Sequence, residues 1–244
     1  MISTRAKLRA HDTLEGDGAR VKRVFPQGWY DHHDPFVLLD EFFVDSSAGF
    51  PEHPHRGFEA VTYMKEGFFG HRDNLGNDRQ LGPGGIQRFT AGRGIVHAEM
   101  PGDEPMNHGF QLWVNLPKRL KGMDPSYQAV EAQKIPETRK NGVRIRTLVG
   151  PGSSVWLNTE VIYEDYLLGS DASVNVRVPD DMSGIIYAYA GKLGAFEFEL
   201  RPGEAVPVQE GERLKLTTRK PSAFLLVVGK PHGEPIHHNG AFVD

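Results

Sequence analysis

The chain has 244 residues, a formal net charge of −4 and no cysteine. The acidic balance argues against direct nucleic-acid binding, and the lack of cysteine excludes disulfides, thiolate metal ligands and cysteine nucleophiles. The N-terminus carries no apolar leader, and no apolar run is long enough to cross a membrane. The sequence therefore predicts a soluble protein of the cytoplasm.

Apolar residues alternate with polar ones in short segments, which is the pattern of half-buried β-strands. In chain order, the predicted strands are 36–43, 59–65, 86–90, 110–116, 143–149, 160–168, 173–178, 185–190, 196–200, 213–218 and 223–229. Between them stand most of the 28 glycines and 17 prolines. The pattern indicates an all-β sandwich or barrel.

One stretch interrupts the strand pattern. Residues 118–141 are mostly polar and proline-rich, and the segment 127–134 within them is long enough for two helical turns at most. We expect 118–141 to be a linker between an N-terminal domain, 1–117, and a C-terminal domain, 142–244.

The segments on the two sides of this linker follow a similar order. Gly67 and Gly191, for example, follow matching strands and stand 124 residues apart (191 − 67). This spacing favours a duplicated β unit. Because no histidine occurs between His108 and His232, only the first unit offers imidazole ligands.

Two ligand pairs with strand spacing are the main functional signal. They are His53-x-His55 and, 42 residues after His55 (97 − 55), His97-x-Glu99. Alternate residues of a strand point to the same side, so two neighbouring strands would bring all four side chains together. Three imidazoles and a carboxylate suit a redox-capable or Lewis-acidic divalent metal.

The surroundings of these pairs resemble the cupin pattern. Glu59 follows His55 by four residues, and the glycine-rich stretch 82–94 leads to His97. In cupins one motif supplies His-x-His and a following Glu, and a second supplies glycine turns and a third His. Gly67 falls one residue late for this pattern, and Gly92 stands where many cupins have proline.

Longer segments resemble one cupin family, the pirins, in order and spacing. They are DPFVLLDEFF (34–43), FPEHPHRGFEAVTYMKEG (50–67), TAGRGIVHAEMP (90–101), HGFQLWVNLP (108–117) and GEPIHHNGAFV (233–243). The resemblance implies a bicupin, with two β-barrels of the double-stranded β-helix or jelly-roll type. It also implies one Fe(2+) per chain on His53, His55, His97 and Glu99, in the N-terminal barrel only. Other divalent metals are compatible with the same donors.

The two patterns differ in the carboxylate that they assign to the metal. The general cupin pattern offers Glu59, and the pirin resemblance assigns Glu99. We favour Glu99, because it lies two residues from His97 and shares that residue's strand face. Glu59 is then expected either to hydrogen-bond to a metal ligand or to face solvent.

Other polar residues near the motifs receive weaker expectations. Gln111, on the strand face of Trp113, is expected to line the pocket. Arg56 and Arg93 flank the ligand motifs, at the pocket mouth or as solvated loop charges. The remaining histidines considered are expected outside the ligand set: His71 on a hairpin surface, His108 in a structural role, and His32, His33, His237 and His238 in loops.

The resemblance also implies a function. Four protein ligands on an octahedral Fe(2+) leave two positions open, which suits a dioxygenase. Pirins are associated with quercetin 2,3-dioxygenase activity, in which dioxygen opens a flavonol and carbon monoxide is released. Glu99 is then expected to be catalytic, as the acceptor of a substrate hydroxyl proton. The alternative implied by the family is a metal- and redox-dependent module that binds a protein partner as a transcriptional co-regulator.

Overall fold

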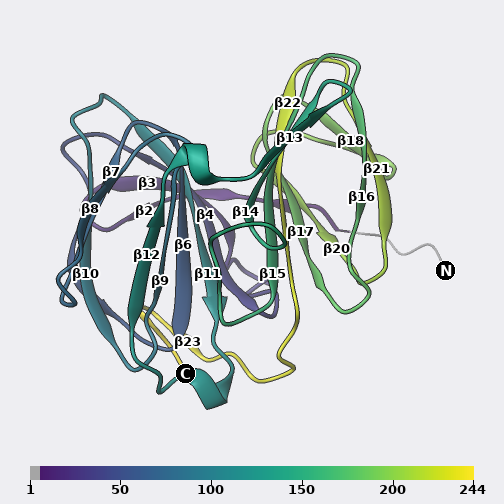
Figure 1. The fold of residues 1–244 in the computed structure, drawn as a ribbon. Helices are drawn as coiled ribbons and strands as arrows, with labels where there is room; N and C mark the ends of the chain where they lie inside the picture. The colour runs from purple at the N-terminus through teal and green to yellow at the C-terminus, as the bar shows by residue number, and fades with distance from the viewer. Residues whose placement is uncertain (1–5) are drawn as a thin grey trace. The chain divides into compact units, whose positions relative to one another are not determined.

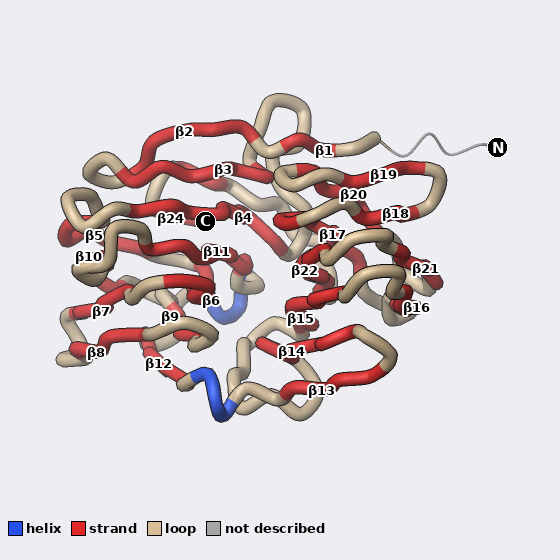
Figure 2. Tube along the Cα trace, turned by 90° about the horizontal axis from the view of Figure 1, so that it is seen from above, coloured by secondary structure: helices blue, strands red, loops and turns tan. Residues whose placement is uncertain are grey.

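The computed structural model describes residues 6–244, so the first five residues of the predicted N-terminal domain lie outside it. The chain forms two compact units of β-strands (Figure 1). We call residues 11–135, 157–159 and 232–244 the N-terminal barrel, and residues up to 10, 136–156 and 160–231 the C-terminal barrel. The predicted all-β fold with two barrels is confirmed. Two short 3-10 helices, η1 (Lys118–Leu120) and η2 (Ala132–Lys134), appear in blue in Figure 2.

The N-terminal barrel consists of two antiparallel sheets. Its large sheet has the order β12 (Ser126–Val130), β9 (Ile86–Thr90), β6 (Phe58–Glu66), β11 (Asn107–Asn115), β4 (Phe36–Val44), β3 (Ala19–Phe25) and β2 (His11–Glu15). Its small sheet has the order β5 (Phe50–His55), β10 (Ile95–Pro101), β7 (Phe69–Asp73) and β8 (Asp78–Leu81). A terminal hairpin of β23 (His238–Asn239) and β24 (Phe242–Val243) belongs to the same barrel.

The C-terminal barrel has the same arrangement. Its large sheet has the order β1 (Leu8–Arg9), β20 (Glu204–Val208), β17 (Ser183–Ala190), β22 (Ser222–Gly229), β15 (Val161–Leu168), β14 (Val143–Val149) and β13 (Glu137–Lys140). Its small sheet has the order β16 (Ser173–Arg177), β21 (Arg213–Thr217), β18 (Leu193–Ala195) and β19 (Phe198–Leu200).

The strand order makes the predicted duplication visible. Strands β2 to β11 of the N-terminal barrel recur as β13 to β22 of the C-terminal barrel, in the same sheets and with the same neighbours. The barrels differ at one edge of the large sheet, where the first has β12 and the second has β1, from the other end of the chain. All eleven histidines lie in the N-terminal barrel.

The segment predicted as a linker, 118–141, contains the strand β12 besides η1 and η2. Within it, β12 pairs with β9 and closes the edge of the large sheet. Tyr127 of β12 is half-buried against His71, and Val130, on the opposite face of the strand, is buried. The prolines lie outside the strands: Pro125 immediately precedes β12, and Pro136 immediately precedes β13. Of the predicted strand 196–200, only residues 198–200 form a strand, β19; Phe196, in the left-handed region at φ 56°, lies in the turn between β18 and β19.

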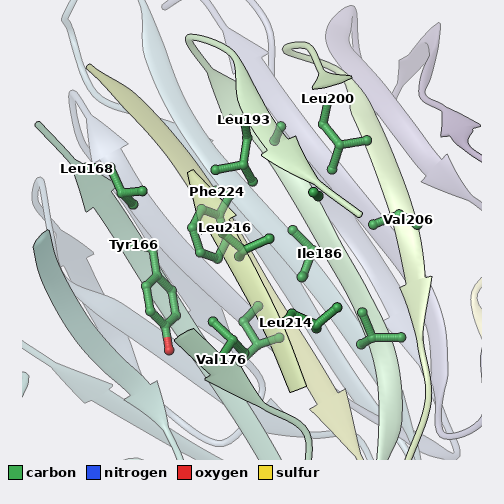
Figure 3. Packing of buried hydrophobic residues seen from close by; sticks show 14 of the residues in the cluster. Tyr166, Leu168, Val176, Ile186, Leu193, Leu200, Val206, Leu214, Leu216 and Phe224 are labelled. Atoms are coloured by element: carbon green, nitrogen blue, oxygen red, sulfur yellow. The ribbon is translucent and has the colours of Figure 1, made fainter. Parts of the chain in front are cut away.

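The interiors of the barrels differ in chemistry. The cluster at the centre of the C-terminal barrel is apolar apart from one tyrosine hydroxyl, as the side chains of Figure 3 show. Its members include Tyr166, Leu168, Val176, Ile186, Leu193, Leu200, Val206, Leu214, Leu216 and Phe224. The N-terminal barrel instead buries histidines, carboxylates and amides beside its apolar clusters. This barrel therefore contains the candidate site.

Candidate metal centre

Three of the predicted ligands meet on two neighbouring strands. β5 and β10 pair antiparallel, with His97 opposite His53. The Nε2 atoms of these two residues are 3.1 Å apart, and His55 joins them in a group whose ligand atoms all lie within 4.8 Å of one another. The convergence follows from the period of two in each His-x-His or His-x-Glu pair.

Backbone carbonyls orient two of the rings. His53 Nδ1 lies 2.7 Å from the Pro51 carbonyl oxygen, and His55 Nδ1 lies 3.1 Å from that of Ala241. Because a carbonyl can only accept, each Nδ1 carries the hydrogen and each Nε2 keeps a free lone pair. Metal-binding histidines are commonly oriented by such contacts.

A chain of side chains orients the third ring. His97 Nδ1 is 3.3 Å from His71 Nδ1, and His71 Nε2 donates to Asp73 Oδ2 over 2.9 Å. His71 Nδ1 is then the acceptor for the His97 Nδ1 hydrogen, which leaves the His97 Nε2 lone pair for the site. Burial would raise the pKa of Asp73, but hydrogen bonds from His71, Asn77 and Leu75 outweigh it and hold the pKa below its usual range.

His71 is not on a hairpin surface as predicted. Its side chain is buried, and its ring stacks on Tyr127 with centroids 4.2 Å apart. The turn after Asp73 is exposed, but His71 lies two residues earlier in β7, on the inward face shared with Phe69 and Asp73. The His-x-Asp spacing and the buried phenylalanine two residues before it were the signals that sequence analysis missed.

Glu99 is buried, and side chains of the large sheet hold its carboxylate. Oε1 accepts hydrogen bonds from Thr62 Oγ1 (3.2 Å) and Gln87 Nε2 (2.9 Å), and Oε2 accepts one from Gln111 Nε2 (3.1 Å). A register shift separates Glu99 from His97 on the pair with β5. Such a bulge redirects a side chain.

The predicted ligands, together with His71, form two overlapping groups. The first group consists of His53, His55 and His97, and the second of His71, His97 and Glu99. His97 belongs to both. The ligand set His53, His55, His97 and Glu99 stays a prediction.

Glu59 has neither of the roles predicted for it. It is fully buried and accepts hydrogen bonds from Thr90 Oγ1 (2.7 Å) and from the backbone and side-chain nitrogens of Asn158 (2.8 and 2.9 Å). Burial raises its pKa against the effect of these bonds. Gly57, at φ 87°, separates β5 from β6, so the parity of His53 and His55 does not continue to Glu59. Thr62 reaches the site from β6 instead.

Burial keeps two of these histidines, His55 and His97, neutral. It lowers the pKa of His55 to about 3, and the neighbouring His53 adds to the effect. The pKa of His97 is also lowered, by burial first and then by His55, His53 and His71. Neutral imidazole is the form that binds a metal. Three free Nε2 lone pairs beside a buried carboxylate therefore fit a first-row divalent ion.

A pocket of about 640 Å³ opens beside the histidines. Gln111 and Trp113 line it, which confirms that prediction. The wall is otherwise formed by aromatic and aliphatic side chains and by charged groups. The lining residues used below are Glu15, Asp17, Arg23, Asp40, Phe42, Phe50, Glu52, Phe69 and Glu99.

The other sequence candidates lie elsewhere or in the pocket wall. Arg56 and Arg93 form exposed ion pairs with Asp244 and Asp124, both at 3.0 Å, and are not among the lining residues. His238 lines the pocket and its ring is 5.7 Å from that of Trp113, but it is outside both histidine groups.

His108 has the predicted structural role. It stacks on Phe43 with ring centroids 4.5 Å apart, and its Nε2 lies 2.9 Å from Glu41 Oε1. His32, His33 and His237 are outside both histidine groups and do not line the pocket.

Comparison with known proteins agrees with this geometry. The family models for pirin and for the pirin C-terminal cupin domain match residues 18–114 and 163–244. The chain belongs to the pirin family. It is 37% identical to human Pirin over 245 residues, which cover 96% of this chain and 84% of the human protein. A pirin-like protein of tomato, Solanum lycopersicum, is 38% identical over 246 residues, which cover 97% and 84% of the two chains.

The crystal structure of a quercetin 2,3-dioxygenase from Acinetobacter baumannii is also similar to this chain. Its TM-score is 0.89 at 28% sequence identity, and the match covers 98% of this chain and 90% of that one. The pirin and bicupin assignments made from the sequence are thereby confirmed. Within residues 6–244, no helix has the length and apolar character needed to span a bilayer.

Proposed function

We propose that this pirin is a metal-dependent dioxygenase that opens flavonols such as quercetin with dioxygen. The main supporting observation is the convergence of His53, His55 and His97 beside an aromatic-lined pocket, with Glu99 in a second group that shares His97. The likeness to a quercetin 2,3-dioxygenase supports the substrate class. In this proposal His53, His55, His97 and Glu99 hold one Fe(2+), and other divalent metals fit the same donors.

The chain's own residues prepare the substrate. Fe(2+), when bound, supplies the Lewis acidity and redox chemistry for reaction with dioxygen. Glu99 accepts the proton of a flavonol hydroxyl, which raises the electron density of the ring that dioxygen attacks. Gln111 and Gln87 hold the Glu99 carboxylate in place by the hydrogen bonds described above.

The pocket wall has a second role in this proposal. Phe50, Phe69 and Trp113 offer aromatic surface to a planar ligand and exclude water around the reacting ring.

Oxygen uptake with purified protein tests the proposal. Fe(2+)-loaded protein should consume quercetin and release carbon monoxide in air, and should leave quercetin intact without oxygen. His97→Ala should lose the activity and the metal, since it removes the residue common to both groups. His108→Ala is the matched control, because it removes a histidine that lies outside both histidine groups. Unchanged turnover in His97→Ala would refute the proposed function.

A further inference from the structure

A row of polar side chains crosses the large sheet of the N-terminal barrel. At one register level, directly opposite residues on β3, β4, β11, β6 and β9 are Arg23, Asp40, Gln111, Thr62 and Gln87. These strands are neighbours in this order (Figure 2). Directly opposite residues of paired strands point to the same face. The row therefore runs along the inner wall, and three of its members hydrogen-bond to Glu99.

The far end of this row is an ion pair in the pocket wall. Arg23 Nε and Nη2 donate to the two carboxylate oxygens of Asp40 over 2.9 and 2.7 Å, and Nη1 lies 2.7 Å from Glu15 Oε1. The Arg23 and Asp40 side chains are 17% and 7% exposed. A charge pair this buried costs desolvation and is weak support for stability.

The charges of the wall select the kind of ligand. Five carboxylates line the pocket (Glu15, Asp17, Asp40, Glu52 and Glu99) against one arginine, which gives a formal charge of −4 (1 − 5) with neutral histidines, and −2 with Fe(2+) bound. Arg23 is already engaged by two of these carboxylates. The wall would repel an anionic ligand and favours a neutral ligand that carries hydrogen-bond donors.

We propose that Asp40, held by Arg23, is a specificity-determining acceptor for a hydroxyl of the bound phenol. A carboxylate has about four lone-pair sites, and Arg23 uses one on each oxygen, so Asp40 can still accept from a ligand. Its two-point contact with Arg23 fixes the carboxylate before binding. Asp40 lies one strand beyond Gln111. It therefore accepts a hydrogen bond from a hydroxyl of the ligand other than the ligand oxygens that face the histidines. This inference rests on the proposed function and narrows its substrates to polyhydroxylated flavonols.

Binding of two flavonols without oxygen tests this inference. The probes are quercetin and 3-hydroxyflavone, which keeps the chelating hydroxyl and carbonyl but lacks every other hydroxyl. Dissociation constants are measured with Fe(2+)-loaded protein by quenching of intrinsic fluorescence. Wild type should prefer quercetin by roughly tenfold or more, as for a hydrogen bond to a charged group. The ratio of the two dissociation constants is compared between variants, because any difference in metal chelation between the two probes is then cancelled.

Two variants and one control make the test specific. Asp40→Asn should reduce the preference for quercetin over 3-hydroxyflavone to a few-fold. The double variant Arg23→Met with Asp40→Leu removes both charges without leaving one unpaired, and should also lose the preference. Glu41→Gln, the next residue of β4, alters the contact with His108 and should keep the wild-type ratio.

The outcomes separate the inference from the proposed function. If both Asp40 variants keep the wild-type ratio of the two dissociation constants, Asp40 does not have the proposed role. Quercetin binding and turnover would persist in that case, so the proposed function would stand. Equal affinity of wild type for the two probes would overturn the role of Asp40 as well. If neither flavonol binds to wild type, the proposed function fails first.

Discussion

The position of each ring hydrogen decides whether the histidines of this site can bind a metal. Two carbonyls and the chain from His97 through His71 to Asp73 leave all three Nε2 lone pairs free. Such outer contacts are worth about 10–100-fold in metal affinity. Residues outside the predicted ligand set, such as His71 and Asp73, are therefore expected to affect metal binding.

Replacing His71 should therefore weaken metal binding without removing a predicted ligand. We expect His71→Ala to lower the affinity for Fe(2+) or Ni(2+) by about 10–100-fold, because His97 loses the acceptor for its Nδ1 hydrogen. Competition with a metal chelator measures the effect. His108→Ala serves as the control and should keep wild-type affinity. Equal affinities for the two variants would contradict the orienting role of His71.

His33 should make folding sensitive to acid. Burial lowers its pKa to about 4, against about 6.5 in an unfolded chain. As the pH falls below about 6.5, the unfolded state takes up the proton first, so stability is lost progressively down to about pH 4. The effect on the free energy of unfolding should be about 1–2 kcal/mol between about pH 7.5 and about pH 5.

Urea unfolding of wild type and His33→Asn at the two pH values measures this contribution. Asn can still accept the hydrogen bond of Tyr30, which contacts His33 Nδ1. Asp40 acts in the opposite sense, since burial raises its pKa to about 6 and its contribution grows as the pH falls. That contribution is common to both proteins and cancels in the difference. A pH dependence that is the same in both proteins would show that His33 does not contribute.

Among the elements, the terminal segment 232–244 is the one that most affects the site. It folds with the N-terminal barrel and brings the Ala241 carbonyl to His55. Lys121 Nζ donates to the carbonyls of Gly57 and Val243 over 2.9 and 2.8 Å. Val243 is itself fully buried. The turn at Gly57 is therefore where β5, β6 and this segment meet.

A side chain at Gly57 should disturb this arrangement. A Cβ there would lie 1.8 Å from the Val243 carbonyl oxygen, and φ is already in the left-handed region. We expect Gly57→Ala to cost more than about 2 kcal/mol in the free energy of unfolding and to weaken metal binding, because the Ala241 carbonyl moves away from His55. Urea unfolding and metal titration measure both effects.

Gly203→Ala, in the C-terminal barrel, is the matched control for this change. Gly203 has nearly the same positive φ, 86°, but nothing lies within 4 Å of the added Cβ. It should show only the backbone strain of about 1–2 kcal/mol, with normal metal affinity. If Gly57→Ala and its control bind metal equally well, the terminal segment 232–244 does not orient His55.

At the scale of the whole molecule, the two duplicated barrels differ in the chemistry of their interiors. The barrels share a strand order, yet the histidines occupy only one of them. The other is filled by a cluster of large apolar side chains. The partner-binding role implied by the pirin resemblance and the cytoplasmic location stay predictions.

This difference predicts that a core change in the C-terminal barrel affects stability alone. Phe224 is fully buried and stacks on Tyr166 with ring centroids 4.5 Å apart. Phe224→Ala should cost about 3–5 kcal/mol in the free energy of unfolding and leave one metal ion bound per folded chain. Elemental analysis and thermal unfolding check the two expectations. His97→Ala should show the reverse pattern, and metal loss in Phe224→Ala that remains folded would contradict this prediction.

The sequence by itself determined the β fold, the pirin family and the barrel that carries the histidines. Period-two patterns report which face of a strand a residue occupies, and that is local information. Only the tertiary structure placed His71 and Asp73 behind His97, turned Glu59 away from the site, and aligned Arg23 and Asp40 with Gln111. These relations depend on which strands pair, on their register and on turns such as Gly57, where strand parity restarts.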